Sequence, residues 1–129
     1  MKKNLLGVLV AILIVAAVLV GSRFVRADEK PAEVTLSGTV VDMHCYVTHD
    51  LHDAKHTACA NACIARGVPA GFLADDGTLY VLFDVKPFSV KDKVAGLADL
   101  PATLKGTPVV RGGVKGIQIK SIEKKPSDR

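Results

Sequence analysis

The stretch VTLSGTVV, at Val34–Val41, decides the fold that the sequence predicts. Apolar residues alternate there with small or polar ones, and β-branched side chains are frequent, which is typical of a β-strand. Similar patterns follow at Gly71–Ala74 and Leu79–Asp84, separated by Asp75-Asp76-Gly77. Because glycine accepts a positive φ without steric cost, Asp-Gly between two apolar runs indicates a hairpin. The centre of the chain is therefore predicted to be β-rich.

The last third of the chain predicts a second hairpin after a short helix. The helix is expected at Ser89–Leu100, where apolar residues recur at helical intervals. Strands are expected at Thr107–Val114 and Ile117–Ile122, with the turn at Lys115–Gly116. Five strands with a helix between the third and fourth match the order of an OB-type barrel. The predicted class is mainly β (α+β), a small five-stranded OB-like barrel.

Two polar stretches bound this predicted domain. Residues 28–33 (DEKPAE) form a short linker that contains a proline, and residues 125–129 are expected to be a disordered tail. The OB-like domain between them spans residues 34–124. It carries a helical insertion at residues 50–66, which is the main departure from an ordinary OB-type barrel.

An apolar segment precedes the domain. Leu5–Val20 contains no polar side chain and follows Lys2 and Lys3, as in the basic and apolar regions of a secretory signal. Val25-Arg26-Ala27 offers small residues for cleavage after Ala27. Residues 1–27 are therefore expected to be either a signal peptide or an N-terminal anchor helix, with residues 5–20 in the inner membrane if they are retained. Both alternatives predict an exported, periplasmic domain, soluble or tethered.

The charge of the chain is concentrated in this leader. Lys2, Lys3, Arg23 and Arg26 are four of the 17 Lys and Arg residues, which leaves 13 against the 13 Asp and Glu residues from Asp28 onward. The net charge of +4 therefore belongs to the leader, and the domain is neutral. The chain also has no Trp and only six Phe or Tyr residues, so the basic, aromatic surface of a nucleic-acid-binding protein is not expected.

The chemically informative residues are concentrated in the insertion. All three cysteines and all four histidines lie between His44 and Cys63. Leu51–Arg66 is rich in alanine, has no internal proline or glycine and precedes Gly67, which predicts a helix with Asp50 as its N-cap. Four residues on one side of this helix are expected to pack against the barrel: Leu51, Ala58, Ala62 and Ala65.

An adjacent face of the predicted helix carries metal-ligating side chains. His52, His56, Cys59 and Cys63 are separated by four, three and four positions, the spacings of neighbours on one helical face. Cys45 lies just after the first predicted strand and is expected to approach the same point. The predicted ligands are three thiolates and one imidazole, which suit a tetrahedral site: Cys45, Cys59, Cys63 and His56. The alternative histidines are His44, His49 and His52.

The thiolates limit the metal to a few candidates. Soft ligands select zinc, copper(I) or an iron–sulfur centre, and export of an unfolded chain disfavours the last. The predicted cofactor is zinc or copper. The predicted role is copper or zinc handling, or support of extracytoplasmic redox chemistry, with another exported or membrane protein as a further partner.

An odd number of cysteines leaves a second interpretation open. Outside the cytoplasm thiols tend to pair, so a structural disulfide from Cys45 to Cys59 or Cys63 would leave one free thiol. This arrangement predicts a thiol-redox or protein-interaction module. Cys59 and Cys63 themselves are poorly placed for a disulfide if they lie four apart in a regular helix.

No serine lies in a nucleophile-elbow context and no acid–base carboxylate pair is evident, so the sequence favours a binding protein over an enzyme.

Three segments carry a resemblance to a known group of proteins. They are GTVVDMHC at Gly38–Cys45, HTACANAC at His56–Cys63 and GVPAG at Gly67–Gly71. In these segments the chain resembles a family of small exported bacterial OB-like domains of unknown function with a Cys/His-rich insertion. The resemblance implies a fold and a compartment, and it implies no activity.

Overall fold

The computed structural model describes residues 31–87 and 89–126 of the chain. The predicted signal peptide or anchor at residues 1–27, most of the linker at 28–33 and the end of the predicted tail lie outside the described residues. Within the described ranges, no helix is long and apolar enough to cross a membrane.

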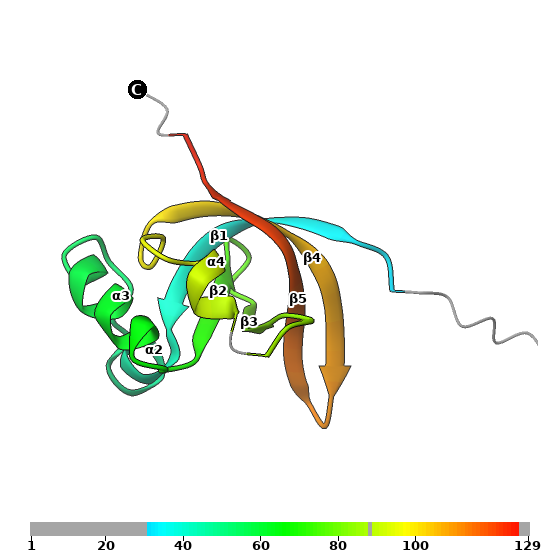
Figure 1. Cartoon of the computed structure of the whole chain (residues 1–129), viewed down its shortest axis with the longest axis horizontal. Coiled ribbons are helices and arrows are strands. Elements are labelled where there is room, and N and C mark those ends of the chain that lie inside the picture. The colour runs from blue at the N-terminus through cyan, green and yellow to red at the C-terminus, as the bar shows by residue number, and fades with distance from the viewer. Residues whose placement is uncertain (1–30, 88, 127–129) are drawn as a thin grey trace, which may run out of the picture. The chain divides into compact units, whose positions relative to one another are not determined.

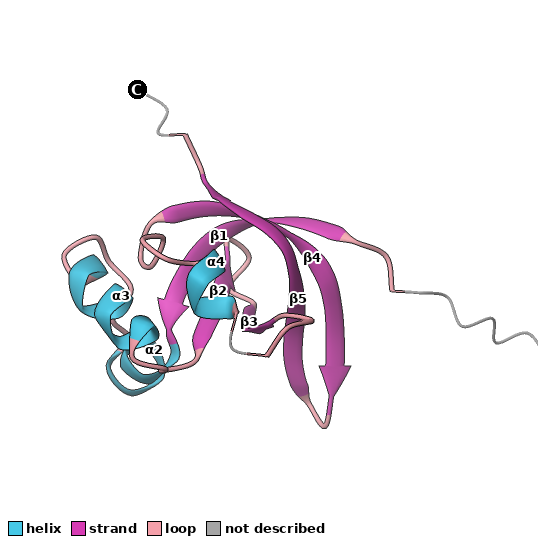
Figure 2. Cartoon of the chain, viewed as in Figure 1, coloured by secondary structure: helices cyan, strands magenta, loops and turns pink. Residues whose placement is uncertain are grey.

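The described residues form a mainly β domain with short helices (Figures 1 and 2). This confirms the coarse prediction of a β-rich domain with five strands and a helix between the third and fourth. The elements are β1 (Val34–Asp42), α2 (Met43–His49), α3 (Thr57–Ala65), β2 (Ala70–Ala74), β3 (Leu79–Phe83), α4 (Val90–Lys93), β4 (Pro101–Arg111) and β5 (Val114–Lys124).

The five strands pair in a closed order, β1-β2-β3-β5-β4. β1 pairs antiparallel with both β2 and β4, while β3 and β5 run parallel. At the middle of β1, Gly38 pairs with Ala74 on one side and Ala102 on the other. A Cβ at this position would lie 2.8 Å from the Cα of Ala74, so the close approach of β1 and β2 requires glycine.

Both hairpins form, but one turn differs from the prediction. The predicted β2–β3 turn is present, with Gly77 at φ 82° donating its N–H to the carbonyl of Ala74. The β4–β5 turn lies at Gly112 and Gly113, at φ 54° and 81°, and the predicted turn at Lys115–Gly116 is wrong. Two consecutive positive φ angles match the twist of a two-residue hairpin. Because the turn comes earlier than predicted, β4 ends at Arg111 and β5 begins at Val114, while β4 begins at Pro101, before its predicted start.

The predicted helix at Ser89–Leu100 is also mostly wrong. Only α4 is helical, and the chain turns at Gly96 and Asp99, which have φ angles of 76° and 58°. The segment between them returns to the sheet, because Ala98 forms a parallel bridge with Val40 of β1. Tertiary pairing with β1 therefore replaces the last turns of the expected helix.

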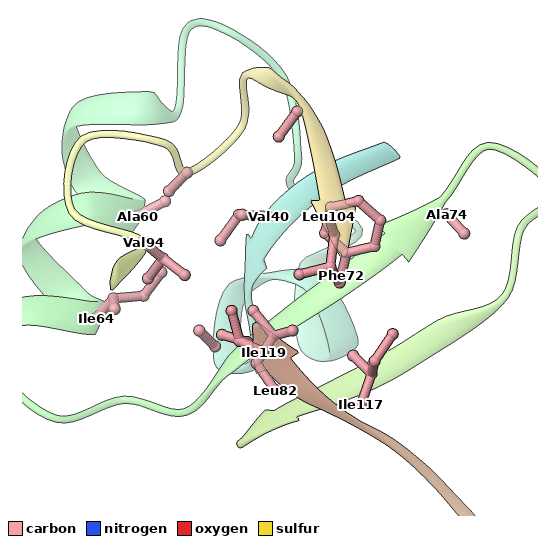
Figure 3. Packing of buried hydrophobic residues seen from close by; sticks show 13 residues of the cluster. Val40, Ala60, Ile64, Phe72, Ala74, Leu82, Val94, Leu104, Ile117 and Ile119 are labelled. Carbon is pink, nitrogen blue, oxygen red and sulfur yellow. The ribbon is translucent and has the colours of Figure 1, made fainter. Parts of the chain in front are cut away.

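The core joins the sheet to the insertion. Phe72, Leu104 and Ile117 are fully buried between the strands. Ala60 and Ile64 of α3 belong to the same buried cluster, and Figure 3 shows them beside Val94 at one side of the core, with Leu104 and Phe72 further along. Burial of each large side chain contributes about 1.5–3 kcal/mol to folding. The insertion is therefore packed on the sheet.

The insertion between β1 and β2 begins earlier than predicted and contains two helices, α2 and α3. The prediction of one helix over residues 50–66 is wrong, because only α3 lies within this range. Asp50 has φ 55° and ends α2, with its N–H bonded to the carbonyls of Cys45 and Tyr46, so it is a C-cap. The chain then turns at Asp53, whose Oδ1 accepts from the N–H groups of Lys55 and His56. The left-handed conformation of Asp50 and the side-chain bonds of Asp53 therefore interrupt the helix in this segment. The C-terminal end of the helix is as predicted, with α3 stopping just before Gly67 at φ 106°.

Candidate functional site

The end of β1 positions the first cysteine. Asp42 is the last residue of β1 and is completely buried. Its Oδ1 accepts from the N–H of His44 at 2.8 Å and of Cys45 at 3.2 Å, which caps the N-terminus of α2. Asp42 and Cys45 are thus held in a fixed relation by the start of one helix.

The orientation of α3 positions the other two cysteines. Ala60 and Ile64 are the buried residues of α3, whereas the predicted barrel-facing residues of the insertion are exposed: Leu51, Ala58, Ala62 and Ala65. The prediction of that face is wrong because Ile64, the largest apolar side chain of α3, sets which side packs on the core. Cys63 is consequently half-buried next to this contact, and Cys59 is exposed.

Cys45 and Cys63 converge on Asp42. One carboxylate oxygen of Asp42 and the two sulfur atoms all lie within 4.8 Å of one another. The two cysteines come from different helices, and all three cysteines are present as thiols. In a tetrahedral site with metal–sulfur bonds of about 2.3 Å, two sulfurs lie roughly 3.8 Å apart. Shifts of about an ångström or less would bring these atoms to the distances of a metal site.

The acid–base properties of the thiols reflect this grouping. Interaction with the nearby Asp42 carboxylate, which favours the protonated thiol, together with burial raises the pKa of Cys63 to about 11. Burial and Asp42 also raise the pKa of Cys45. Cys59 also contributes to raising the pKa of both thiols, but the structure does not bring its sulfur into the group formed by Asp42, Cys45 and Cys63. A bound cation would reverse this effect, because it favours deprotonated ligands.

His56, the predicted fourth ligand, has a different partner. The Nδ1–H of His56 donates to Oδ2 of Asp99 at 2.8 Å, and the two side chains are only 9% and 0% exposed. The pair fixes the start of α3 to the segment before β4. Burial raises the pKa of Asp99, and His56 opposes that shift. The structure does not bring His56 into the group formed by Asp42, Cys45 and Cys63.

The remaining histidines lie at the surface of the insertion. His44 and His49 are exposed on α2, with ring centroids 6.3 Å apart. His52 follows α2, where its Nδ1 lies 3.1 Å from the carbonyl oxygen of Asp50 and its ring lies 5.4 Å from that of Tyr46. These three alternative ligands are therefore not grouped with the cysteines.

The predicted ligand set did not include Asp42. A signal for it exists in the sequence, because an aspartate three positions before Cys45 has the spacing of an N-cap whose carboxylate lies beside the first turn. The pairing of His56 with Asp99 has no such signal, since 43 positions separate the two residues.

The chain was compared with protein-family models, curated proteins and solved structures. No protein-family model, curated protein or solved structure matches this chain.

Proposed function

We propose that this protein is an exported OB-like domain that binds one zinc or copper ion through Cys45, Cys59 and Cys63. One observation carries the proposal: cysteines from two separate helices approach each other and a buried carboxylate within 4.8 Å. Thiolates are the ligands that soft and borderline metals prefer. A bound ion would link the end of β1 to both helices of the insertion.

The OB-like architecture belongs to the same proposal. It is supported by the closed strand order, the parallel pairing of β3 with β5 and the position of α4 between β3 and β4. In OB-type barrels the loop between the first two strands is one of the ligand-binding loops. The Cys/His insertion occupies that loop. The resemblance to small exported bacterial domains is in accord with this architecture.

Export and a protein partner are inferred from other features. The apolar segment at residues 5–20 and the preceding lysines support transfer of the domain across the inner membrane. On the insertion, Val47 and Leu51 expose 65% and 40% of their surfaces, which supports contact with another exported or membrane protein. A C-terminal alkaline phosphatase fusion should be active outside the cytoplasm and lose this activity when residues 1–27 are deleted.

The test of metal binding is the ratio of metal to chain. Protein purified without chelator should contain one zinc or copper ion per chain, and chelator should release both the ion and reactive thiols. Cys63→Ser should lose the ion. His49→Ala, which changes an exposed histidine of the same insertion, should retain it. Metal-free protein whose thiols are unchanged by chelator would contradict the proposal.

The same geometry offers one alternative, a disulfide between Cys45 and Cys63. The proximity of the two sulfur atoms favours this disulfide. With it, the domain would be a thiol-redox or protein-interaction module. The raised pKa of Cys63 argues against a thiol-exchange role, because the thiolate is the reactive form. Mass spectrometry under non-reducing conditions distinguishes the two functions, since a disulfide lowers the mass by two hydrogens and excludes both cysteines from metal binding.

A further inference from the structure

We infer that Asp42 is itself a ligand of the proposed metal and that its carboxylate selects a divalent cation, zinc, over copper(I). This inference depends on the proposed function and names the ligand set within it. The set is three cysteine sulfurs and one carboxylate oxygen, in place of the imidazole that the sequence predicted.

The first support is an oxygen without a partner. Asp42 is fully buried, and Oδ1 accepts both N–H groups at the start of α2. Oδ2 is also buried, and it has no hydrogen-bond partner among the described residues. A buried charged oxygen without a partner is costly, and such atoms in native proteins commonly mark an ion or a water. One oxygen of this carboxylate lies within 4.8 Å of the sulfur atoms of Cys45 and Cys63.

The second support is the charge of the group. With Asp42 ionised and both thiols deprotonated, three negative charges lie within 4.8 Å of one another. A divalent cation compensates two of these charges and a monovalent cation only one, so the group favours the divalent ion. A carboxylate oxygen is also an ordinary ligand for zinc at about 2.0–2.2 Å, whereas copper(I) prefers sulfur.

The third support is that the Asp42 carboxylate, and not the His56 imidazole, belongs to the group that contains the two sulfur atoms. Nε2 of His56 is also buried without a hydrogen-bond partner among the described residues, but it lies outside that group. His56 donates to Asp99 from a nearly buried position and holds the start of α3. His56 lies at the start of α3, whereas Cys63, which belongs to the group with Asp42, lies near the end of this helix.

The experiment compares two metals on the full chain. Asp42→Asn keeps an oxygen that can cap α2 and removes the charge. Competition with chromophoric chelators should show at least tenfold weaker zinc binding, while copper(I) binding changes less than threefold. Asp53→Asn is the matched control, because Asp53 also accepts two backbone N–H groups in the insertion but is exposed and does not belong to the group that contains the sulfur atoms. It should leave both affinities unchanged.

A second variant and a second readout guard against misfolding. Asp42→Ser can also cap α2 and should reproduce the selective loss of zinc. Circular dichroism should show the same fold for each variant. The visible spectrum of the cobalt(II)-loaded protein should shift in both Asp42 variants, because the coordination set changes.

The outcomes separate the two proposals. Equal loss of zinc and copper(I), or no loss of either, would overturn the role of Asp42 and leave the thiol-based metal site intact. Failure of the unsubstituted protein to bind either metal would overturn the proposed function and this inference together.

Discussion

At the scale of single residues, the proximity of Asp42 raises the pKa of the Cys63 thiol to about 11. A pKa of about 11 leaves about one thiolate in a thousand at pH 8. We predict that iodoacetamide modifies exposed Cys59 well before Cys63 in metal-free protein at this pH. Asp42→Asn removes the charge that favours the protonated thiol, so the pKa of Cys63 should fall and its alkylation should become about tenfold faster or more.

Peptide mass spectrometry over a time course measures both rates. Asp53→Asn serves as the control and should leave the rate at Cys63 unchanged. An equally fast reaction of Cys59 and Cys63 in the unsubstituted protein would contradict the assigned environment of Cys63.

The buried pair of His56 and Asp99 makes a second prediction at this scale. His56→Ala leaves the Asp99 carboxylate buried without its imidazole partner, which typically costs about 3–5 kcal/mol of folding free energy. Urea unfolding should show a loss of about this size. His52→Ala, which removes a 41% exposed histidine close by, should change stability by less than about 0.5 kcal/mol. Similar losses for the two variants would show that the buried pair is unimportant.

At the scale of elements, α4 is fixed to the sheet by a carboxylate. Asp84 accepts from Ser89 and pairs with Lys93 at 2.8 Å, and Lys93 also donates to the carbonyl of Ile119 in β5 at 3.3 Å. Lys93 and Ser89 together lower the pKa of Asp84 to about 2. Because the folded pKa lies below the ordinary value of 3.8, the pair stabilises the protein above about pH 4 and this contribution is lost as the pH falls towards 2.

We therefore predict that Asp84→Asn is less stable than the unsubstituted protein at pH 7. Between pH 4 and 2 the difference should shrink, because protonation removes the same ion pair from the unsubstituted protein. Thermal unfolding at several pH values measures this convergence. Asp75→Asn, which changes an exposed aspartate between β2 and β3, is the control for general charge effects. A difference that stays constant down to pH 2 would contradict the prediction.

At the scale of the whole molecule, the proposed ion would connect the sheet to its insertion. Ligands from the end of β1, from α2 and from α3 would be joined through one centre. Zinc at about a hundred times its dissociation constant should therefore stabilise the fold by about 2.7 kcal/mol and raise Tm by about 10 °C or more. Calorimetry with zinc, and again with chelator, measures the shift.

Mild acid should reverse this stabilisation, because thiolates must be deprotonated to bind metal. Cys63→Ser should show neither the rise with zinc nor the fall with chelator. A Tm that is the same with zinc, with chelator and at mildly acidic pH would count against a metal that links the insertion to the sheet.

The sequence alone determined the strands, their approximate order and the location of the reactive residues. Alternation along Val34–Val41 and the Asp-Gly turn at Gly77 are local signals, since each depends on neighbours in the chain. The confinement of every cysteine and histidine to one insertion is likewise visible without a structure. Helix boundaries were less predictable, because a separate helix ends at Asp50 and the side chain of Asp53 binds backbone N–H groups, so α3 begins only at Thr57.

Only the tertiary structure decided which side chains meet. Packing of Ile64 on the core set the rotation of α3, and this brought Cys63 to Asp42 and Cys45. His56, which shares a helical face with the cysteines in the sequence pattern, instead pairs with Asp99 from a distant loop. The physical reason is that periodicity specifies which residues share a face, whereas the burial of large apolar and charged groups against distant segments specifies what that face contacts.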